Sequence, residues 1–439
     1  MAEEKGQSVA RILVLGGYGF IGAEVTRALS KAGFSPCAMG RDAASAARVL
    51  PEVRFLQGDL RHLQAVSDWT AILTEFDLVV NCAGALQDSR DDDLAAVHHG
   101  AVAALAQAAA QRGIGVVQIS AVGATKVAST EFMRSKGRGD DVLRGLGGSV
   151  WIVRPGLVIG RTAYGGTALL RMLAAVPGVQ PMALGQVWVQ SVSVQDVAGA
   201  VLAAAEGQLP PGEYDLVEEE PQTLRQVVSE TRKWLGFAPA RLTLPLPLWL
   251  VRQVGRMADQ MGRLGWRSPL RSTAIQVLEE GIGGDPGPYR HATGQMLGSL
   301  QDVYAAMPSG PEHRLAARMA LMMPVSVAVL SFFWLASGGI GLWQVREAAD
   351  TLIDVGWSPL AATVAVVFWS AVDLSLGAAI LWRPWAARAC LAMVAVSLIY
   401  MISAAVFTPD LWFDPLGPMI KVAPGVILSL ITHQLLQSR

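Results

Sequence analysis

Three glycines near the start of the chain have the spacing of a phosphate-binding turn. They follow an aliphatic run at residues 11–15 and precede a stretch with a helical pattern, Ala23–Ala32. The first glycine lets the chain turn sharply off a strand, the second leaves room for a pyrophosphate, and the third lets the helix pack on the sheet. N–H groups at the start of the helix would bind the phosphates. The residues predicted to contact a dinucleotide here are Gly16, Gly19, Phe20, Ile21 and Gly22.

A second candidate contact follows the next predicted strand, Ser35–Met39, which is succeeded by Gly40, Arg41 and Asp42. An acidic residue at position 40 would bind the ribose 2′-hydroxyl of NADH, but the glycine leaves that space empty. Arg41 can instead pair with a 2′-phosphate through two parallel hydrogen bonds. The pattern favours NADPH over NADH, and the alternative is an arginine that is only a solvated surface residue.

Small and polar residues after two later strands suit the rest of the coenzyme. Gly58–Leu60 follows the third predicted strand and suits contact with an adenine ring. Asn81–Gly84 follows the fourth strand and suits a close approach of the coenzyme to the backbone. The residues predicted to contact the coenzyme here are Asp59, Leu60, Asn81, Ala83 and Gly84.

Residues 11–205 alternate short apolar runs with helical patterns, among them the alanine-rich Leu94–Gln111. This alternation predicts an α/β fold, a Rossmann doubly wound parallel sheet. The predicted strands are Ile12–Leu15, Ser35–Met39, Arg54–Gln57, Leu78–Asn81, Gly115–Ile119 and Ser149–Val153.

The composition of the 439 residues indicates that charged residues are unevenly distributed along the chain. A formal net charge of −1 provides no basic field, which excludes nucleic acid as a partner. Only 16% of residues are charged and 52% are hydrophobic, so part of the chain must be nearly free of charge. The first residues lack a signal pattern, and the cysteines lack metal-ligand spacing, so we expect the first domain in a reducing cytoplasm.

Four stretches after Arg318 are long and apolar enough to predict a four-helix transmembrane bundle. Arg314 and Arg318 precede the first span, and Arg383 and Arg388 lie between the second and third, whereas the other two loops are acidic on balance. The positive-inside rule then predicts a multi-pass protein of the inner (cytoplasmic) membrane, with both termini and the nucleotide domain in the cytoplasm. The predicted spans are Met319–Trp343, Pro359–Trp382, Pro384–Phe407 and Leu416–Leu436.

Asp373 is the one carboxylate that lies well inside a predicted span. A charge there is costly and usually faces a cavity or a partner. Arg388, which enters the third span from the same side, is the expected partner. The pair is either a structural clasp or a polar site for a lipid or quinone headgroup.

Between the two regions lies the amphipathic stretch Leu244–Trp266, followed by the Gly- and Pro-rich segment Gly281–Arg314, which we predict to be a linker. The amphipathic stretch is either a helix that covers the substrate or a helix that lies on the bilayer. The predicted domains are a nucleotide-binding domain at 1–240, this segment at 241–313 and a membrane domain at 314–439.

Residues 10–240 resemble the short-chain dehydrogenase/reductase superfamily, in its extended and atypical branch. Within that branch they are similar to the group around the nucleotide-binding accessory subunit of respiratory complex I. The four spans resemble a DoxX-like domain. The segments that carry the first resemblance are Gly16–Gly22, Gly58–Leu60, Asn81–Gly84, Ser120–Ala124, Phe132–Lys136 and Arg154–Gly160. In the last of these segments, the resemblance implies a coenzyme contact at Pro155.

The resemblance also implies a Tyr-x-x-x-Lys motif, in which the tyrosine hydroxyl exchanges a proton. Here Lys136 is present, but Phe132 occupies the tyrosine position, so acid–base catalysis by that route is impossible. Ser120 stands where the helper serine of the family is expected, and Lys136 is expected to bind the nicotinamide ribose. Thr130 and Glu131 are close in sequence, but on a helix they point away from position 132.

The sequence offers no metal site. His98 and His99 are adjacent on a predicted helix and face different directions, and Asp91–Asp93 precede them at a polar junction.

Two functions remain open. The first is a membrane-anchored NADPH-dependent oxidoreductase that acts on a lipophilic substrate such as a quinone, isoprenoid or lipid. The second is a non-catalytic NADPH-binding protein with a structural, assembly or redox-sensing role, for which Phe132 argues. The expected partners are a membrane lipid or quinone, with a membrane-protein partner or a second copy of the chain as further possibilities.

Overall fold

The computed structural model describes residues 9–88, 92–415 and 417–437, so Asp91 and Leu416 of the sequence predictions lie outside the described residues. The chain divides into two compact units. The first contains the residues up to Met257 together with Ser268–Arg314, and the second contains Ala258–Arg267 together with the residues from Leu315 onward.

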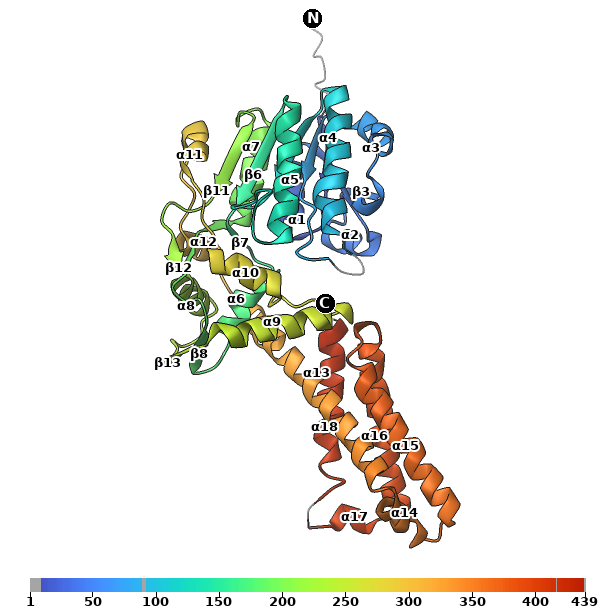
Figure 1. The fold of residues 1–439 in the computed structure, drawn as a ribbon. Helices are drawn as coiled ribbons and strands as arrows, with labels where there is room; N and C mark the ends of the chain where they lie inside the picture. The colour runs from blue at the N-terminus through green and yellow to red at the C-terminus, as the bar shows by residue number, and fades with distance from the viewer. Residues whose placement is uncertain (1–8, 89–91, 416, 438–439) are drawn as a thin grey trace, which may run out of the picture. The chain divides into compact units, whose positions relative to one another are not determined.

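The first unit is built on a parallel sheet, which has seven strands within the described residues, in the order β11-β6-β5-β4-β1-β2-β3 (Figure 1). This confirms the predicted doubly wound fold. The chain leaves β1 in one direction and returns to its other side at β4, and such a switch point is where ligands bind in these sheets. The strands are β1 (Arg11–Leu15), β2 (Ser35–Gly40), β3 (Arg54–Gln57), β4 (Leu78–Asn81), β5 (Gly115–Ile119), β6 (Val150–Pro155) and β11 (Gly212–Leu216).

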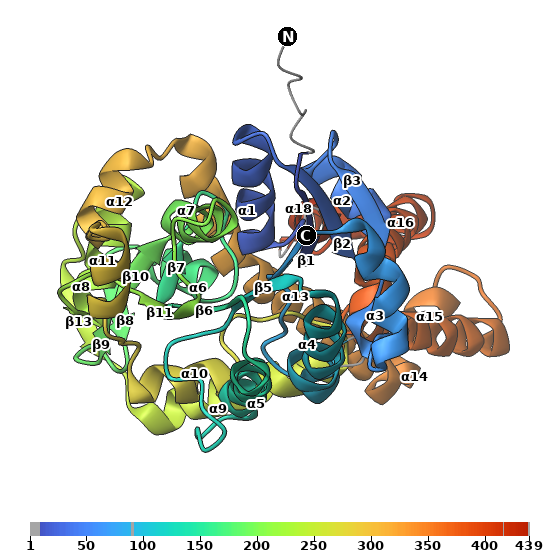
Figure 2. The same cartoon turned by 90° about the horizontal axis from the view of Figure 1, so that it is seen from above.

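Helices cover both faces of this sheet (Figure 2). Because successive strand side chains point to opposite faces, Ile12 and Val14 pack under α1 and α7, whereas Leu13 and Leu15 pack under α3, α4 and α5. Both faces are buried, which is why these strands are continuous apolar runs in the sequence. The helices are α1 (Phe20–Lys31), α3 (Val66–Ile72), α4 (Ala101–Arg112), α5 (Glu131–Leu146) and α7 (Val194–Ala205).

The prediction that Gly281–Arg314 is a linker is wrong, because this segment is folded into the first unit. Leu300 and Val303 are buried in one apolar cluster with Val227. The buried Glu218 carboxylate accepts the Leu300 N–H at 3.0 Å and thereby ties this segment to the sheet. The helices concerned are α8 (Leu224–Trp234), α11 (Gly287–Thr293) and α12 (Leu300–Ala306).

The second unit is helical. Within the described residues, three of its helices are long and apolar enough to cross a membrane, and they coincide with the first three predicted spans. The fourth prediction coincides with an apolar helix of 16 residues, α18, which is shorter than the roughly 20 residues that a spanning helix needs. The helices are α13 (Pro311–Trp343), α14 (Val345–Ile353), α15 (Pro359–Ala379), α16 (Arg383–Phe407), α17 (Asp410–Phe413) and α18 (Val422–Gln437).

Candidate functional site

The glycine turn at the end of β1 has no room for side chains. Gly16 has a φ of 66°, and its N–H donates to the Met39 carbonyl at 2.8 Å. A Cβ on Gly16 would lie 2.9 Å from the Ala83 Cα, and one on Gly22 would lie 2.2 Å from the Gly16 oxygen. Gly19 caps α1 in an extended conformation. The first N–H groups of α1 therefore open onto the carboxyl edge of the sheet, as a pyrophosphate site requires.

The side chains of Phe20 and Ile21 serve the fold rather than a ligand. The Phe20 ring stacks on Tyr164 with centroids 6.3 Å apart, and a Cβ on Gly160 would lie 2.8 Å from that ring. Ile21 packs against the core under α1. Any contact of these two residues with a dinucleotide comes from their backbone N–H groups.

The space beside Gly40 is filled, contrary to the sequence prediction. A Cβ on Gly40 would lie 2.4 Å from the Tyr18 ring, whose hydroxyl accepts the Asp42 N–H at 3.1 Å. An acidic side chain is therefore excluded at position 40 by packing. Arg41 extends from the end of β2 and forms an ion pair with Asp92 at 3.0 Å.

Asp59 and Leu60 follow β3 and are held by their neighbours. The Arg61 guanidinium donates to the Asp59 carboxylate at 2.6 Å, and this hydrogen bond lowers the pKa of Asp59. The Leu60 side chain is buried in the core under α3 and α4.

The turn after β4 is fixed by Asn81, which is almost fully buried. Its amide donates to Gln118 at 2.8 Å and its side-chain oxygen accepts the Ala83 N–H at 3.1 Å. A Cβ on Gly84 would lie 3.3 Å from the His98 Nε2 and 3.7 Å from the Lys136 Nζ. The turn therefore brings the glycine loop of β1, α5 and the helical turn Ala96–Gly100 before α4 together at one edge of the sheet.

Lys136 is buried at this edge, with 6% of its surface exposed, so it is not a solvated helix lysine. Its ammonium donates to the Ile119 carbonyl at 3.0 Å and lies 5.8 Å from the centroid of the Phe132 ring. Burial lowers the pKa of Lys136, an effect that Asp140 opposes. An ammonium has three N–H donors, so this group has donors available for a ligand.

Ser120 donates its hydroxyl to the buried Asp140 carboxylate at 2.6 Å. Burial raises the pKa of Asp140, which also lies 3.6 Å from the Arg154 guanidinium. The structure thus commits the Ser120 proton to Asp140, a residue that the sequence analysis missed. Its position four residues after Lys136 is the signal that would have found it, because residues at that spacing share one helix face. Pro155 ends β6 and is buried, and its carbonyl accepts the Val122 N–H at 3.3 Å.

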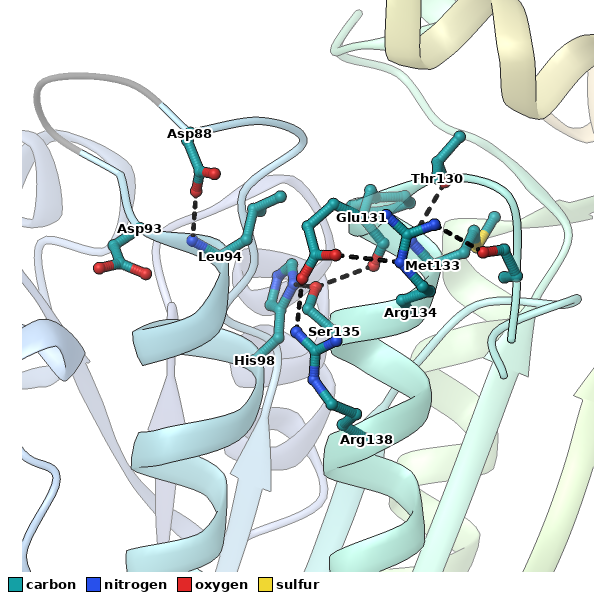
Figure 3. Close-up of polar contacts among 12 residues, drawn as sticks. Asp88, Asp93, Leu94, His98, Thr130, Glu131, Met133, Arg134, Ser135 and Arg138 are labelled. Carbon is teal, nitrogen blue, oxygen red and sulfur yellow. Dashed lines mark hydrogen bonds and ion pairs between the residues drawn. The ribbon is translucent and has the colours of Figure 1, made fainter. Parts of the chain in front are cut away.

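His98 is a second buried residue that the sequence analysis left at a polar junction. Its Nε2 accepts the Ala85 N–H at 3.1 Å and its Nδ1 lies 2.9 Å from the Ser135 hydroxyl (Figure 3). Ser135 in turn donates to the Phe132 carbonyl at 3.0 Å, so the ring is neutral with its hydrogen on Nδ1. Burial and the charge of Lys136 hold the pKa of His98 well below its ordinary value.

The two residues before Phe132 are engaged elsewhere (Figure 3). The Glu131 carboxylate lies between Arg138 at 2.5 Å and Arg134 at 3.0 Å, and the hydrogen bond from Arg138 lowers the pKa of Glu131. Thr130 caps α5 by accepting the Met133 N–H at 3.3 Å. A carboxylate held ionised in this way is a poor proton donor, so neither residue replaces the missing tyrosine.

The predicted Asp373–Arg388 pair in the second unit is wrong. The buried Asp373 carboxylate accepts hydroxyl hydrogens from Ser337 of α13 and Tyr400 of α16, each at 2.7 Å, while Arg388 is exposed. Hydroxyls on the two facing helices satisfy both carboxylate oxygens, which removes the need for an arginine. Among the described residues, no group of three or more His, Cys, Asp or Glu side chains is arranged to hold a metal ion.

Comparison with known families assigns both units. Residues 12–216 match the NAD dependent epimerase/dehydratase family, and residues 331–430 match the DoxX-like family. The chain joins an epimerase-type short-chain dehydrogenase/reductase domain to a DoxX-like domain. The family match agrees with the glycine turn and the strand order described above.

The short-chain dehydrogenase/reductase domain also has similar curated and solved relatives. The ceramide reductase of Caulobacter vibrioides (strain NA1000 / CB15N) is 24% identical over 238 residues, which cover 54% of this chain and 74% of that protein. The Bordetella bronchiseptica enzyme WbmH, solved with NAD+, superposes with a TM-score of 0.52 at 16% identity over 68% of this chain and 97% of WbmH. The enzyme WbmG of the same organism, solved with NAD, gives 0.52 at 17% identity over 72% and 96%. These structures support the fold.

Proposed function

We propose that this chain is a membrane-bound NAD(P)H-dependent oxidoreductase that reduces a carbonyl group in a lipophilic substrate. The observation that carries the proposal is the buried Lys136 ammonium beside the turn after β4, at the edge where the glycine turn would hold a dinucleotide. The DoxX-like domain with its long apolar helices supports a membrane protein, which would have access to lipids, quinones and isoprenoids. Similarity to a ceramide reductase favours a lipid among these.

The residues at the carboxyl edge of the sheet fit a dinucleotide. The start of α1 would bind its pyrophosphate, and Lys136 would bind its nicotinamide ribose through the N–H groups that Ile119 does not take. Arg41 would bind a 2′-phosphate by exchanging its ion pair with Asp92, which favours NADPH over NADH. The coenzyme supplies the hydride that carbonyl reduction needs.

Proton delivery differs from that of enzymes with a tyrosine. Phe132 has no exchangeable proton, Glu131 is held ionised, and the Ser120 proton is committed to Asp140. Lys136 Nζ is buried 5.8 Å from the Phe132 ring centroid, and burial lowers its pKa, which makes its proton easier to lose. We therefore assign to Lys136 the proton that passes to the carbonyl oxygen.

The experiment that tests this function uses the full-length protein in mild detergent with NADPH and a long-chain keto-lipid. We expect NADPH oxidation with the keto-lipid and slow or absent oxidation with simple ketones. Tight NADPH binding without turnover on a keto-lipid, a quinone or an isoprenoid aldehyde would contradict the proposal. It would favour the alternative, a non-catalytic NADPH-binding membrane protein, which the phenyl ring at Phe132 supports.

The membrane arrangement is part of the proposal. We propose that α18 is a fourth span, and that the nucleotide domain and both chain ends lie in the cytoplasm. The support is the placement of Arg314 and Arg318 before the first span and of Arg383 and Arg388 between the second and third.

A further inference from the structure

Helix α9 (Leu248–Arg263) has an apolar stripe that is exposed to the surroundings. Gly255 is its one buried residue. Met257 is 66% exposed, Val254 is 41% exposed and Leu264 is 39% exposed. These residues fall at three- and four-residue steps with Leu250, so they lie along one side of the helix.

The opposite side of α9 is the one that packs on protein. A Cβ on Gly255 would lie 2.6 Å from Ile275 of α10 (Ser272–Glu280). Arg252 forms an ion pair with Glu279 of the same helix at 2.7 Å. The side of α9 that contains Gly255 and Arg252 therefore packs on α10, and the apolar stripe is exposed.

The end of α9 continues into a segment of the second unit that is fixed at the end of two spans. The Trp266 indole donates to the Leu381 carbonyl at 2.6 Å, and the Arg383 N–H donates to the Leu264 carbonyl at 3.0 Å. The Arg383 guanidinium lies 5.7 Å from the Trp266 ring centroid. Leu381 lies between α15 and α16 and Arg383 begins α16, so the residues that follow α9 are tied to the start of a candidate span.

We propose that α9 lies in the plane of the membrane surface, with its apolar stripe in the outer part of the acyl chains. The occupant of the stripe is an anionic lipid bilayer. Arg256 and Arg263 are exposed on the polar side of α9, from which their long side chains would reach lipid phosphates, and Trp249, 66% exposed, suits the headgroup level.

Helix α10, on which α9 packs, lies close to the candidate site. Ser272, the first residue of α10, is 3.5 Å from the Gln87 side chain, on the loop that follows β4 and contains Gly84. One helix therefore separates the stripe from the turn that contacts Lys136. This placement, which rests on the proposed function, selects an amphiphilic substrate whose tail stays in the bilayer while its headgroup reaches the site.

The test uses full-length protein in vesicles of phosphatidylcholine and phosphatidylglycerol. Met257→Cys carries an environment-sensitive fluorophore, and Val9→Cys, at an exposed apolar residue before β1, is the matched control. Both variants have Cys37, Cys82 and Cys390 replaced by alanine, and both are accepted only if their thermal unfolding midpoint matches that of the parent protein. Val254→Cys provides a second position on the stripe.

We expect lipids with a spin label near the headgroup to quench the label at 257 several-fold more than the label at 9. Replacing phosphatidylglycerol by phosphatidylcholine, or Arg256 and Arg263 by glutamine, should reduce this difference. Equal access of iodide to positions 257 and 9 would overturn the proposal, because the stripe would then be in water. Protection from iodide without lipid quenching would overturn it too, because a protein would then cover the stripe. None of these measurements uses turnover, so they fail independently of the proposed function.

Discussion

Replacing Lys136 by methionine should weaken coenzyme binding without unfolding the protein. Methionine keeps most of the length of the lysine side chain and removes its charge. In the coenzyme-free protein the ammonium is almost fully buried and has one carbonyl acceptor, Ile119. The substitution therefore separates a binding role for Lys136 from a structural one.

The two effects have different magnitudes. A hydrogen bond to a charged donor contributes about 1.5–3 kcal/mol, so losing the ribose contact should weaken NADPH binding roughly 10- to 150-fold. Burial of the ammonium carries a desolvation cost, which the apolar methionine side chain removes. Asp140 loses a cationic neighbour, but burial already raises its pKa, so it can take up a proton. The free energy of unfolding of the coenzyme-free protein should therefore be unchanged or increase.

The assay is a calorimetric titration with NADPH beside a denaturant titration of the coenzyme-free protein, both in the same detergent. Lys126→Met is the matched control, because Lys126 is 72% exposed and makes only an ion pair with Asp141 at 3.6 Å. It should change the dissociation constant by less than about twofold. If Lys136→Met left NADPH binding unchanged and lowered the free energy of unfolding by more than about 2 kcal/mol, Lys136 would be a structural residue.

The remaining predictions concern catalysis, specificity, pH and topology. Phe132→Tyr adds a hydroxyl beside the buried ammonium, so NADPH turnover on a keto-lipid should rise by about tenfold or more; no change would place the reacting group elsewhere. Arg41→Ala should erase most of a preference for NADPH over NADH in binding titrations, and equal affinities in the parent protein would remove the assignment of Arg41. Burial depresses the pKa of His98, so below about pH 6.5 the unfolded chain binds a proton that the folded chain does not. Lowering the pH through this range should therefore lower the thermal unfolding midpoint, and should lower it less in His98→Gln. A reporter active only in the cytoplasm should work after Arg439 and be silent near Thr351, and the reverse pattern would invert the proposed orientation.

The sequence alone was sufficient for the scaffold. The strands Leu78–Asn81 and Gly115–Ile119 were predicted with the bounds that the structure has, because a parallel strand buried on both faces must be a continuous apolar run. The glycine turn was also predictable, since Gly22 is required by the Gly16 backbone of the same turn and Gly16 has a positive φ. The apolar helices after Arg318 follow from length and composition alone.

The tertiary structure decided which side chains meet. It brought His98 to Ser135 and Gly84, paired Asp373 with Ser337 and Tyr400 instead of Arg388, and placed the Tyr18 ring over Gly40. It also folded residues 281–314 into the first unit through the buried Glu218 carboxylate. Periodicity and composition report how each segment prefers to fold and which of its faces is apolar. The partner of a buried polar group is set by helix register and by packing between distant segments, which neither pattern contains.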